Sequence, residues 1–272
     1  MDHPSNIIYQ QRHRGTTVEV IEKDGLRCLT FGSHLRQSCM LLDDPSFLFL
    51  PYSRHMMSAL LFLPHFPKRI LLIGLGGGSL VKFFLHNTPQ AHVEVVEYDP
   101  HILAVAQDFF HLPKGHQQLT VHLGDGAHFF DKGEPKQSPY DLILLDAFDS
   151  HGLVTSIYQP PFLKTCQNHL APGGVIAANV SRGNKPHFQE ALENWKIAYP
   201  EQGWMIPVAR SQNAILIATP KRPAQPPYKP TVHHAKGLSQ RLPLNFTPLL
   251  ERAQPIHDSM WQRVAKVLTQ NA

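Results

Sequence analysis

The sequence has little of what defines the simplest protein classes. Only Cys28, Cys39 and Cys166 are cysteines among its 272 residues. Their spacing argues against a disulfide scaffold or a cysteine-based zinc site, and so low a cysteine content suits a reducing cytosol. Charged residues make up 17% and the net charge is +4, which argues against a chain disordered throughout. The longest apolar-rich stretch, Met56 to Leu63, is far shorter than the ~20 residues of a membrane span. No signal peptide is recognisable, so we expect a cytoplasmic protein without membrane partners.

Proline and basic residues are concentrated at the C-terminal end. Residues 219–272 hold eight prolines and eight Lys or Arg against two acids, a net charge of +6 that leaves −2 for the remainder. Five prolines between Pro220 and Pro230 predict an extended linker, and residues 256–268 predict an amphipathic helix with Trp261 on its apolar side. We expect this extension to pack on the protein or a partner; nucleic acid is not an expected partner.

The remaining sequence predicts an α/β protein. The β-rich runs Thr17–Glu22 and Leu26–Phe31 flank an Asp-Gly turn, and a helix is predicted over 52–63. Further strands are predicted at 69–73, 92–97, 119–123, 141–146, 174–180, 204–208 and 214–219, the last two as an antiparallel pair. Helices are predicted at 79–86, 100–110, 126–130, 159–170 and 185–198. Apolar strands alternating with helices are typical of a parallel sheet covered on both faces. The predicted domains are a β-region (1–50), a nucleotide-binding domain (51–219) and an extension (220–272).

Polar residues gather at the carboxyl ends of four predicted strands. The first strand runs into the glycine turn Gly74-Leu-Gly-Gly-Gly-Ser, and Glu97 ends the second at a spacing suited to binding ribose hydroxyls. The third and fourth strands end in GDG and DAFD, which contain Asp125, Gly126, Asp146 and Asp149. Each acid alone could equally cap the following helix, but all of them together predict a nucleotide site. The phosphate-loop pattern GxxxxGK[ST] is missing, and the glycine register does not fit a dinucleotide fingerprint.

The segments ILLIGLGGGSL, VEVVEYDP, VHLGDGAHFF, YDLILLDAFD and LAPGGVIAANV resemble the spermidine synthase-like aminopropyltransferases. The resemblance covers about residues 15–218. It implies a Rossmann-like class I methyltransferase sheet preceded by a small β-domain. It also implies that the donor is S-adenosylmethionine or its decarboxylated form, that the acceptor is a small amine, and that a homodimer is compatible with the family.

The resemblance also assigns roles to individual residues. Asp146 would lie at the reacting centre, with Asp149 nearby to hold the amine, and Glu97 would hold the ribose. Asp125, with Gly126 beside it, would meet the adenine amino group. The donor would further contact Gln37, His55, Gly74, Gly76 and Gly77.

Two departures from the family pattern leave the reaction open. Ser79 stands where the family's glycine loop has an aspartate that pairs with the donor's amine, and Arg54 stands where we expect a tyrosine on the substrate wall. A guanidinium suits a carboxylate, which intact S-adenosylmethionine carries and the decarboxylated donor lacks. An ion pair of Arg54 with Asp43 or Asp44, or a position on a solvated helix face, is an equally good interpretation.

The sequence therefore leaves three hypotheses for the function. Aminopropyl transfer to a polyamine is the leading hypothesis, because both Asp146 and Asp149 are retained. A methyltransferase using intact S-adenosylmethionine is the alternative that Arg54 and Ser79 favour. A non-catalytic nucleoside-binding protein is the third. The histidines show no paired metal-ligand spacing, so no metal is expected.

Overall fold

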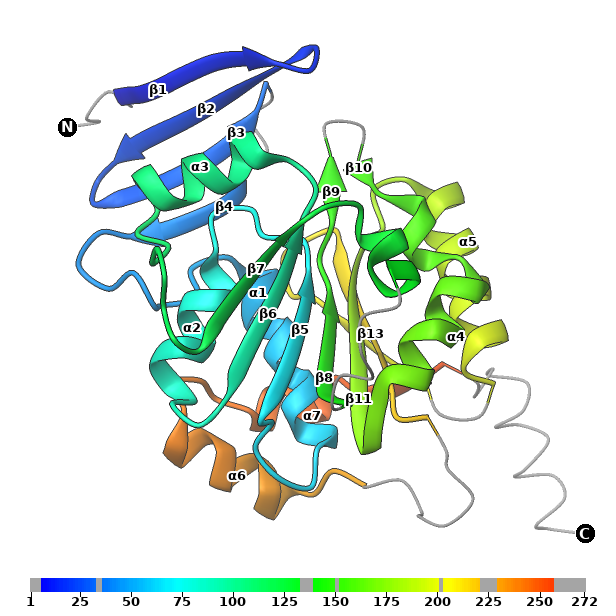
Figure 1. The fold of residues 1–272 in the computed structure, drawn as a ribbon. Coiled ribbons are helices and arrows are strands. Elements are labelled where there is room, and N and C mark those ends of the chain that lie inside the picture. The colour runs from blue at the N-terminus through cyan, green and yellow to red at the C-terminus, as the bar shows by residue number, and fades with distance from the viewer. Residues whose placement is uncertain are drawn as a thin grey trace, which may run out of the picture.

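The computed structural model describes residues 6–32, 36–132, 139–149, 152–200, 203–220 and 229–256. These residues form a small antiparallel N-terminal sheet and an eight-stranded sheet with helices on both faces (Figure 1). A two-stranded ribbon lies at the end of the large sheet that faces the small one. The predicted α/β class, with a β-region in front of the main sheet, is confirmed.

The N-terminal sheet has four strands in sequential order. They are β1 (Asn6–His13), β2 (Thr16–Lys23), β3 (Leu26–Phe31) and β4 (Arg36–Leu41). The two predicted strands and the turn between them are confirmed, whereas β1 and β4 were not predicted. One face of this sheet packs on helix α3 (Pro100–Phe109) through an apolar cluster. That cluster contains Val18, Val20, Leu29, Met40, Ile102, Val105 and Phe110.

The register of β3 and β4 places Cys28 opposite Cys39, and the two form a disulfide. Their sequence spacing gave no reason to pair them, because only the strand register brings them together. The cysteine content therefore no longer indicates a reducing compartment, which corrects the sequence-based inference. Cys166 is free and buried.

The large sheet has the strand order β14-β12-β13-β11-β8-β5-β6-β7. Its strands are β5 (Arg69–Ile73), β6 (His92–Glu97), β7 (Leu119–Leu123), β8 (Tyr140–Leu145), β11 (Leu170–Ser181), β12 (Gly203–Pro207), β13 (Asn213–Ala218) and β14 (Gln254–Pro255). The five strands from β11 to β7 run parallel, and β12, β13 and β14 add antiparallel pairs. Seven of these strands match predictions to within a few residues, including the closing hairpin.

Two apolar layers sandwich the large sheet. One layer contains α1 (Pro51–Met56), the 3-10 helix η1 (Met57–Phe62), α2 (Ser79–Asn87), α6 (Val232–Arg241) and α7 (Thr247–Glu251). The other contains the 3-10 helix η3 (Thr155–Tyr158), α4 (Pro160–His169) and α5 (Lys185–Ala198). The single helix predicted over 52–63 thus divides into α1 and η1. The helix predicted over 126–130 is the 3-10 helix η2 (Gly126–Lys132).

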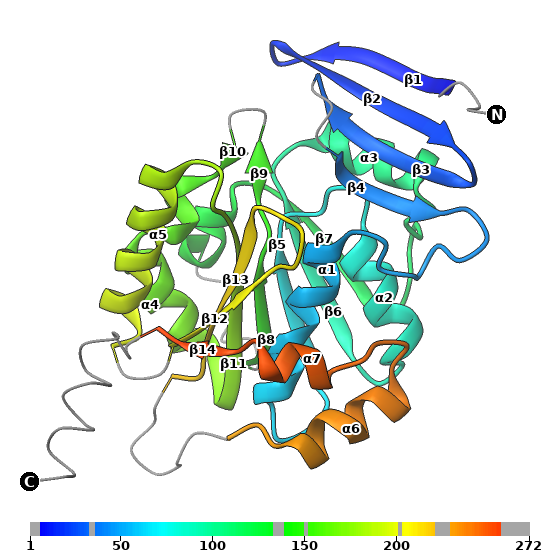
Figure 2. The same ribbon diagram turned by 180° about the vertical axis from the view of Figure 1, so that it is seen from behind.

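The described part of the C-terminal extension packs on the body of the protein. Figure 2 shows α6 and α7 at the end of the molecule away from the N-terminal sheet, and both contact η1. His234 of α6 lies 3.2 Å from the Leu60 carbonyl, and the Arg241 guanidinium lies 3.8 Å from the Phe66 ring centroid. The predicted linker falls largely on 221–228, and Trp261 with most of its predicted helix falls on 257–272. Both lie outside the described residues.

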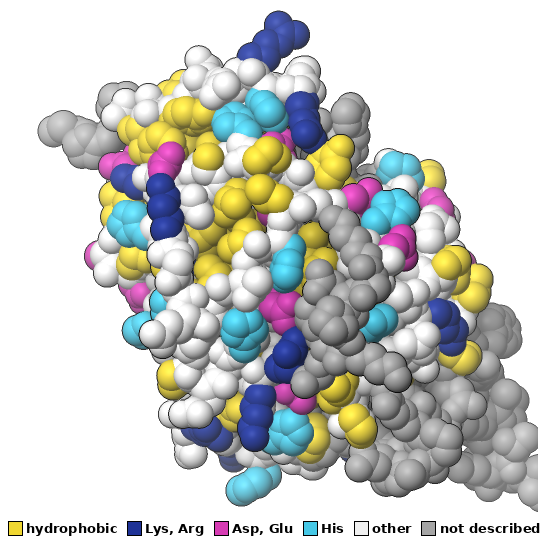
Figure 3. All heavy atoms as spheres, in the orientation of Figure 1, with side chains coloured by type: hydrophobic (Ala, Val, Ile, Leu, Met, Phe, Trp, Pro, Cys, Tyr) yellow, Lys and Arg dark blue, Asp and Glu magenta, His cyan; other side chains and the backbone are white. Residues whose placement is uncertain are grey.

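The surface seen in Figure 3 carries charges of both signs, interspersed with histidine and hydrophobic side chains. None of the helices in the described ranges is long and apolar enough to cross a membrane.

Candidate active site

Asp146 lies where the carboxyl ends of β5 and β8 meet. Its backbone amide donates to the Ile73 carbonyl (2.8 Å), which sets the aspartate beside the first glycine of the turn. Gly74 has φ +101°, and a Cβ there would collide with the Asp146 carbonyl. The glycine turn and the aspartate predicted at the reacting centre are therefore in direct backbone contact.

The Asp146 carboxyl is held by two side chains that the sequence analysis did not identify. Asn179 donates its amide to Asp146 Oδ1 (2.8 Å), and the Tyr52 hydroxyl interacts with the same carboxyl. The same hydroxyl lies 3.0 Å from the Gln37 carbonyl, so the carbonyl and the Asp146 carboxyl share its one proton. Desolvation by the surrounding protein raises the pKa of Asp146 to about 7, and the hydrogen bonds from Asn179 and Tyr52 oppose that rise.

Asn179 is itself fixed by a chain of hydrogen bonds. It is 1% exposed, its side-chain oxygen accepts from Asn213 (2.9 Å), and its carbonyl accepts from the Tyr158 hydroxyl (2.8 Å). Ser211 in turn donates to the Asn213 side-chain oxygen (2.7 Å). Because Asn179 accepts from Asn213, its amino group must face Asp146. The orientation of the carboxyl is thus set by side chains from two strands.

Glu97 joins the end of β6 to the glycine turn. Its Oε1 accepts from the Asp99 amide (2.8 Å), and its Oε2 accepts from the Leu75 amide (3.1 Å). Burial raises the pKa of Glu97, whereas these backbone hydrogen bonds favour its ionised form. Each carboxylate oxygen can accept a second hydrogen bond, so Glu97 can still receive two hydroxyl groups, as a ribose requires.

Gly76, Gly77 and Ser79 border the N-terminal sheet. A Cβ on Gly77 would lie 2.8 Å from the Ser38 hydroxyl, so β4 approaches the glycine turn closely. The Ser79 hydroxyl lies 3.1 Å from that of Ser38 and donates to the Cys39 carbonyl (3.3 Å). Ser79 therefore ties the turn to β4 and brings no negative charge.

Asp125 and Gly126 follow the end of β7. Asp125 is exposed, and its carboxylate accepts from the Ala127 amide (2.9 Å), which caps η2. A Cβ on Gly126 would collide with the Ile73 side chain, so this segment packs directly on the end of β5. The cap leaves Asp125 open to a further donor such as an amino group.

Arg54 and His55 lie on α1 without touching Asp146 in the contacts that the structure gives. Arg54 donates to the Leu48 carbonyl (3.4 Å), and its contacts with described residues include no ion pair with Asp43 or Asp44.

His55 Nδ1 contacts the Pro51 carbonyl (2.7 Å), and burial lowers the pKa of His55. The tyrosine beside Asp146 is Tyr52, two residues before the position at which we expected one.

Asp149 lies in the ribbon formed by β9 (Phe148–Asp149) and β10 (Gly152–Leu153), which Figure 1 places at the same end of the sheet as the N-terminal sheet. Its backbone is described, but its side chain lies outside the described part, so its predicted role stays a prediction. Within the described ranges, no three His, Cys, Asp or Glu side chains are grouped to hold a metal ion.

Comparison with known proteins connects this geometry to a family. The family model for the spermine/spermidine synthase domain matches residues 50–201. The chain is 33% identical over 235 residues to a polyamine aminopropyltransferase of Chromobacterium violaceum, covering 86% of this chain and 88% of the relative.

Solved structures share the fold at lower sequence identity. A probable spermidine synthase from Corynebacterium glutamicum superposes with a TM-score of 0.68 at 18% identity, covering 96% of this chain and 94% of that one. Human methyltransferase-like protein 13, solved in complex with SAH, gives a TM-score of 0.61 at 23% identity over 79% of this chain and 99% of that one. The class I methyltransferase-type sheet expected from the sequence is therefore confirmed.

Proposed function

We propose, because this chain belongs to the spermine/spermidine synthase family, that it transfers an aminopropyl group from decarboxylated S-adenosylmethionine to a di- or polyamine. The observation that carries the proposal is Asp146. Its carboxyl adjoins the glycine turn, is oriented by Asn179 and Tyr52, and has a pKa raised to about 7. Such a group can accept a proton near neutral pH, which aminopropyl transfer requires.

The reaction is a displacement at carbon. The amine nitrogen attacks the carbon beside the sulfonium, a C–N bond forms, the C–S bond breaks, and the neutral thioether 5′-methylthioadenosine leaves. The amine must lose a proton, which Asp146 is placed to accept. An alkylammonium resembles lysine, with a pKa of about 10.4, so moving its proton to an ordinary aspartate at ~3.9 would cost roughly 9 kcal/mol. For Asp146 the same transfer costs about 5 kcal/mol, since its pKa is raised to about 7.

The donor would be held by residues from several strand ends. Glu97 would accept the ribose hydroxyls, Asp125 with Gly126 would meet the adenine amino group, and the glycine turn would lie along the aminopropyl side of the sulfonium. Gln37 and His55 would complete the donor pocket. Asp149 would bind the ammonium at the far end of the acceptor through charge-assisted hydrogen bonds.

Methyl transfer from intact S-adenosylmethionine is the second candidate, because Ser79 favours it. The serine leaves the donor's amine without the carboxylate partner found in the family. The two donors differ in charge at this end of the molecule, because only intact S-adenosylmethionine carries a carboxylate there. The likeness in fold to human methyltransferase-like protein 13 is consistent with that candidate but concerns the fold alone.

Calorimetric titration with the two donors separates the candidates. We expect decarboxylated S-adenosylmethionine to bind at least tenfold more tightly than the intact form, a difference of about 1.4 kcal/mol. Tighter binding of the intact donor would contradict aminopropyl transfer and favour methyl transfer. Binding of neither would contradict both and leave a role other than transfer from these donors.

A further inference from the structure

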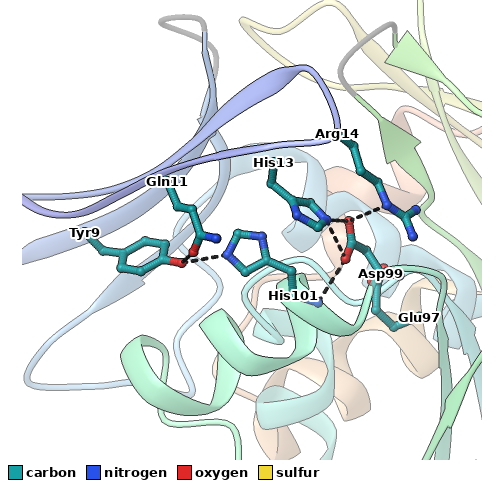
Figure 4. A network of polar contacts seen from close by, with 7 residues as sticks. All are labelled: Tyr9, Gln11, His13, Arg14, Glu97, Asp99 and His101. Atoms are coloured by element: carbon teal, nitrogen blue, oxygen red, sulfur yellow. Dashed lines mark hydrogen bonds and ion pairs between the residues drawn. The ribbon is translucent and has the colours of Figure 1, made fainter.

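Asp99 contacts both Glu97 and the N-terminal β1–β2 hairpin. The Asp99 amide donates to Glu97 Oε1 (2.8 Å), and the Asp99 carboxylate accepts from the His101 amide (2.9 Å) at the start of α3. His13 Nε2, at the end of β1, lies 2.8 and 3.1 Å from the two Asp99 oxygens (Figure 4). Asp99 therefore connects the tip of the β1–β2 hairpin to the proposed ribose acid.

Arg14 adds a second contact from the hairpin tip. Its Nε lies 3.8 Å from Asp99 Oδ2, and its guanidinium carbon lies 4.7 Å from the ring centroid of Tyr98. Tyr98 is 61% exposed and stands between Glu97 and Asp99 in sequence. The tip thus contacts both residues that directly follow Glu97.

The turn that carries Arg14 departs from the usual turn chemistry. Arg14 and Gly15 have φ values of +48° and +81°, the pair of left-handed residues of a tight hairpin turn. Asn, Asp and Gly are favoured at the first of these positions, and arginine there is uncommon. A residue that is poor for the turn but contacts Asp99 and Tyr98 indicates that the contacts, rather than the turn, account for its presence.

A second set of contacts joins strand β1 and the hairpin tip to α3. The His13 and His101 rings meet edge to face with centroids 4.4 Å apart, and His101 Nε2 lies 2.6 Å from the Tyr9 hydroxyl. The Tyr9 hydroxyl donates to Gln11 on the same strand (2.5 Å), as Figure 4 shows. Both strand β1 and the tip of its hairpin therefore contact α3, the helix that Asp99 caps.

We propose that His13 and Arg14 are positioning residues of the donor site, which hold Asp99 and Tyr98 so that Glu97 is fixed for the ribose. The inference rests on the proposed function, because it takes Glu97 to bind the nucleoside of the donor. It gives the N-terminal hairpin an indirect part in donor binding, through Asp99 and Tyr98, although the hairpin tip is not part of the glycine turn.

Two variants test this assignment. His13→Ala removes the hydrogen bonds to Asp99, and Arg14→Asn removes the guanidinium while creating the Asn-Gly pair that the turn prefers. We expect donor Kd and donor KM to rise about five- to tenfold for His13→Ala and about threefold for Arg14→Asn, as lost charge-assisted hydrogen bonds would give. The amine KM should stay unchanged and kcat should change less than about twofold. The Tm of Arg14→Asn should equal or exceed that of the wild type.

Asp24→Asn is the matched control, because Asp24-Gly25 forms an equivalent turn with φ values of +50° and +73° in the β2–β3 hairpin. It should leave donor binding unchanged. Decarboxylated S-adenosylmethionine and 5′-methylthioadenosine are the probes. If the wild type binds them and both tip variants bind equally well, the inference is overturned while the proposed function stands. If the wild type binds neither probe, the proposed function fails and the inference fails with it.

Discussion

Asp146→Asn is expected to lower kcat about a thousandfold while leaving donor affinity within about threefold, as for the loss of a general base. The substitution keeps the shape of the side chain, and Asn179 can still donate to its Oδ1. What it removes is the proposed proton acceptor at the glycine turn. Steady-state kinetics with a diamine acceptor, together with donor titration, measures the two effects separately.

The pH profile provides a second measurement of the same prediction. Only ionised Asp146 can accept the proton, so the slope of log kcat/KM against pH should fall by one as pH rises through about 7. Asp146→Asn should lack this break. A wild-type profile without the break, or an Asp146→Asn variant that retains a tenth of the activity, would contradict a proton-accepting role.

Folding stability supplies a control for Asp146→Asn. The pKa of Asp146 is higher in the folded protein than in the unfolded chain, so the folded state binds more protons between about pH 4 and 7. The aspartate therefore makes the wild type less stable as pH rises through that window. The Asp146→Asn variant should be at least as stable as the wild type at pH 8, and a loss of activity there would not reflect unfolding.

Glu97→Gln is expected to weaken donor binding roughly 100-fold, or about 2.8 kcal/mol. Two effects add. The ribose hydroxyls lose a charged acceptor, and the new amino group faces the backbone amide of either Leu75 or Asp99, which both now donate to the carboxylate. Calorimetric titration with 5′-methylthioadenosine measures this loss without requiring turnover.

Glu94→Gln is the matched control for Glu97→Gln. Glu94 is a buried acid on the same strand, 4% exposed and paired with Arg69 and His122. Its substitution should reduce stability but leave nucleoside affinity unchanged. Equal affinities of the Glu97→Gln variant and the wild type would show that Glu97 does not bind the donor.

The central sheet was predictable because its buried strands are short, nearly continuous apolar runs. Strand β1 was missed because its sequence NIIYQQRH is largely polar and its residues are mostly exposed. The 3-10 helix η1 was predicted as ordinary helix because all six of its residues are buried, which removes the helical periodicity. The disulfide was missed because pairing Cys28 with Cys39 requires the register of β3 and β4.

Some residues of the candidate site could likewise be predicted from the sequence, and others could not. Glu97, Asp125 and Asp146 could be proposed as site residues from the sequence, because acids at the carboxyl ends of parallel strands converge at one edge of the sheet. Tyr52 and Asn179 were missed because their relation to Asp146 is a matter of tertiary packing. The sequence did carry one signal for Asn179, since an amide within the apolar run GVIAANV must find a hydrogen-bond partner when buried. The contacts of His13 and Arg14 with Asp99 could be recognised only from the structure.

The most direct test of aminopropyl transfer is to identify the products formed by the purified protein. Decarboxylated S-adenosylmethionine and a diamine should yield equimolar 5′-methylthioadenosine and an amine heavier by one aminopropyl group, both measured by mass spectrometry. The Asp146→Asn variant should form both about a thousandfold more slowly. No aminopropylated amine from the wild type, together with a methylated acceptor and S-adenosylhomocysteine from the intact donor, would contradict the proposed reaction.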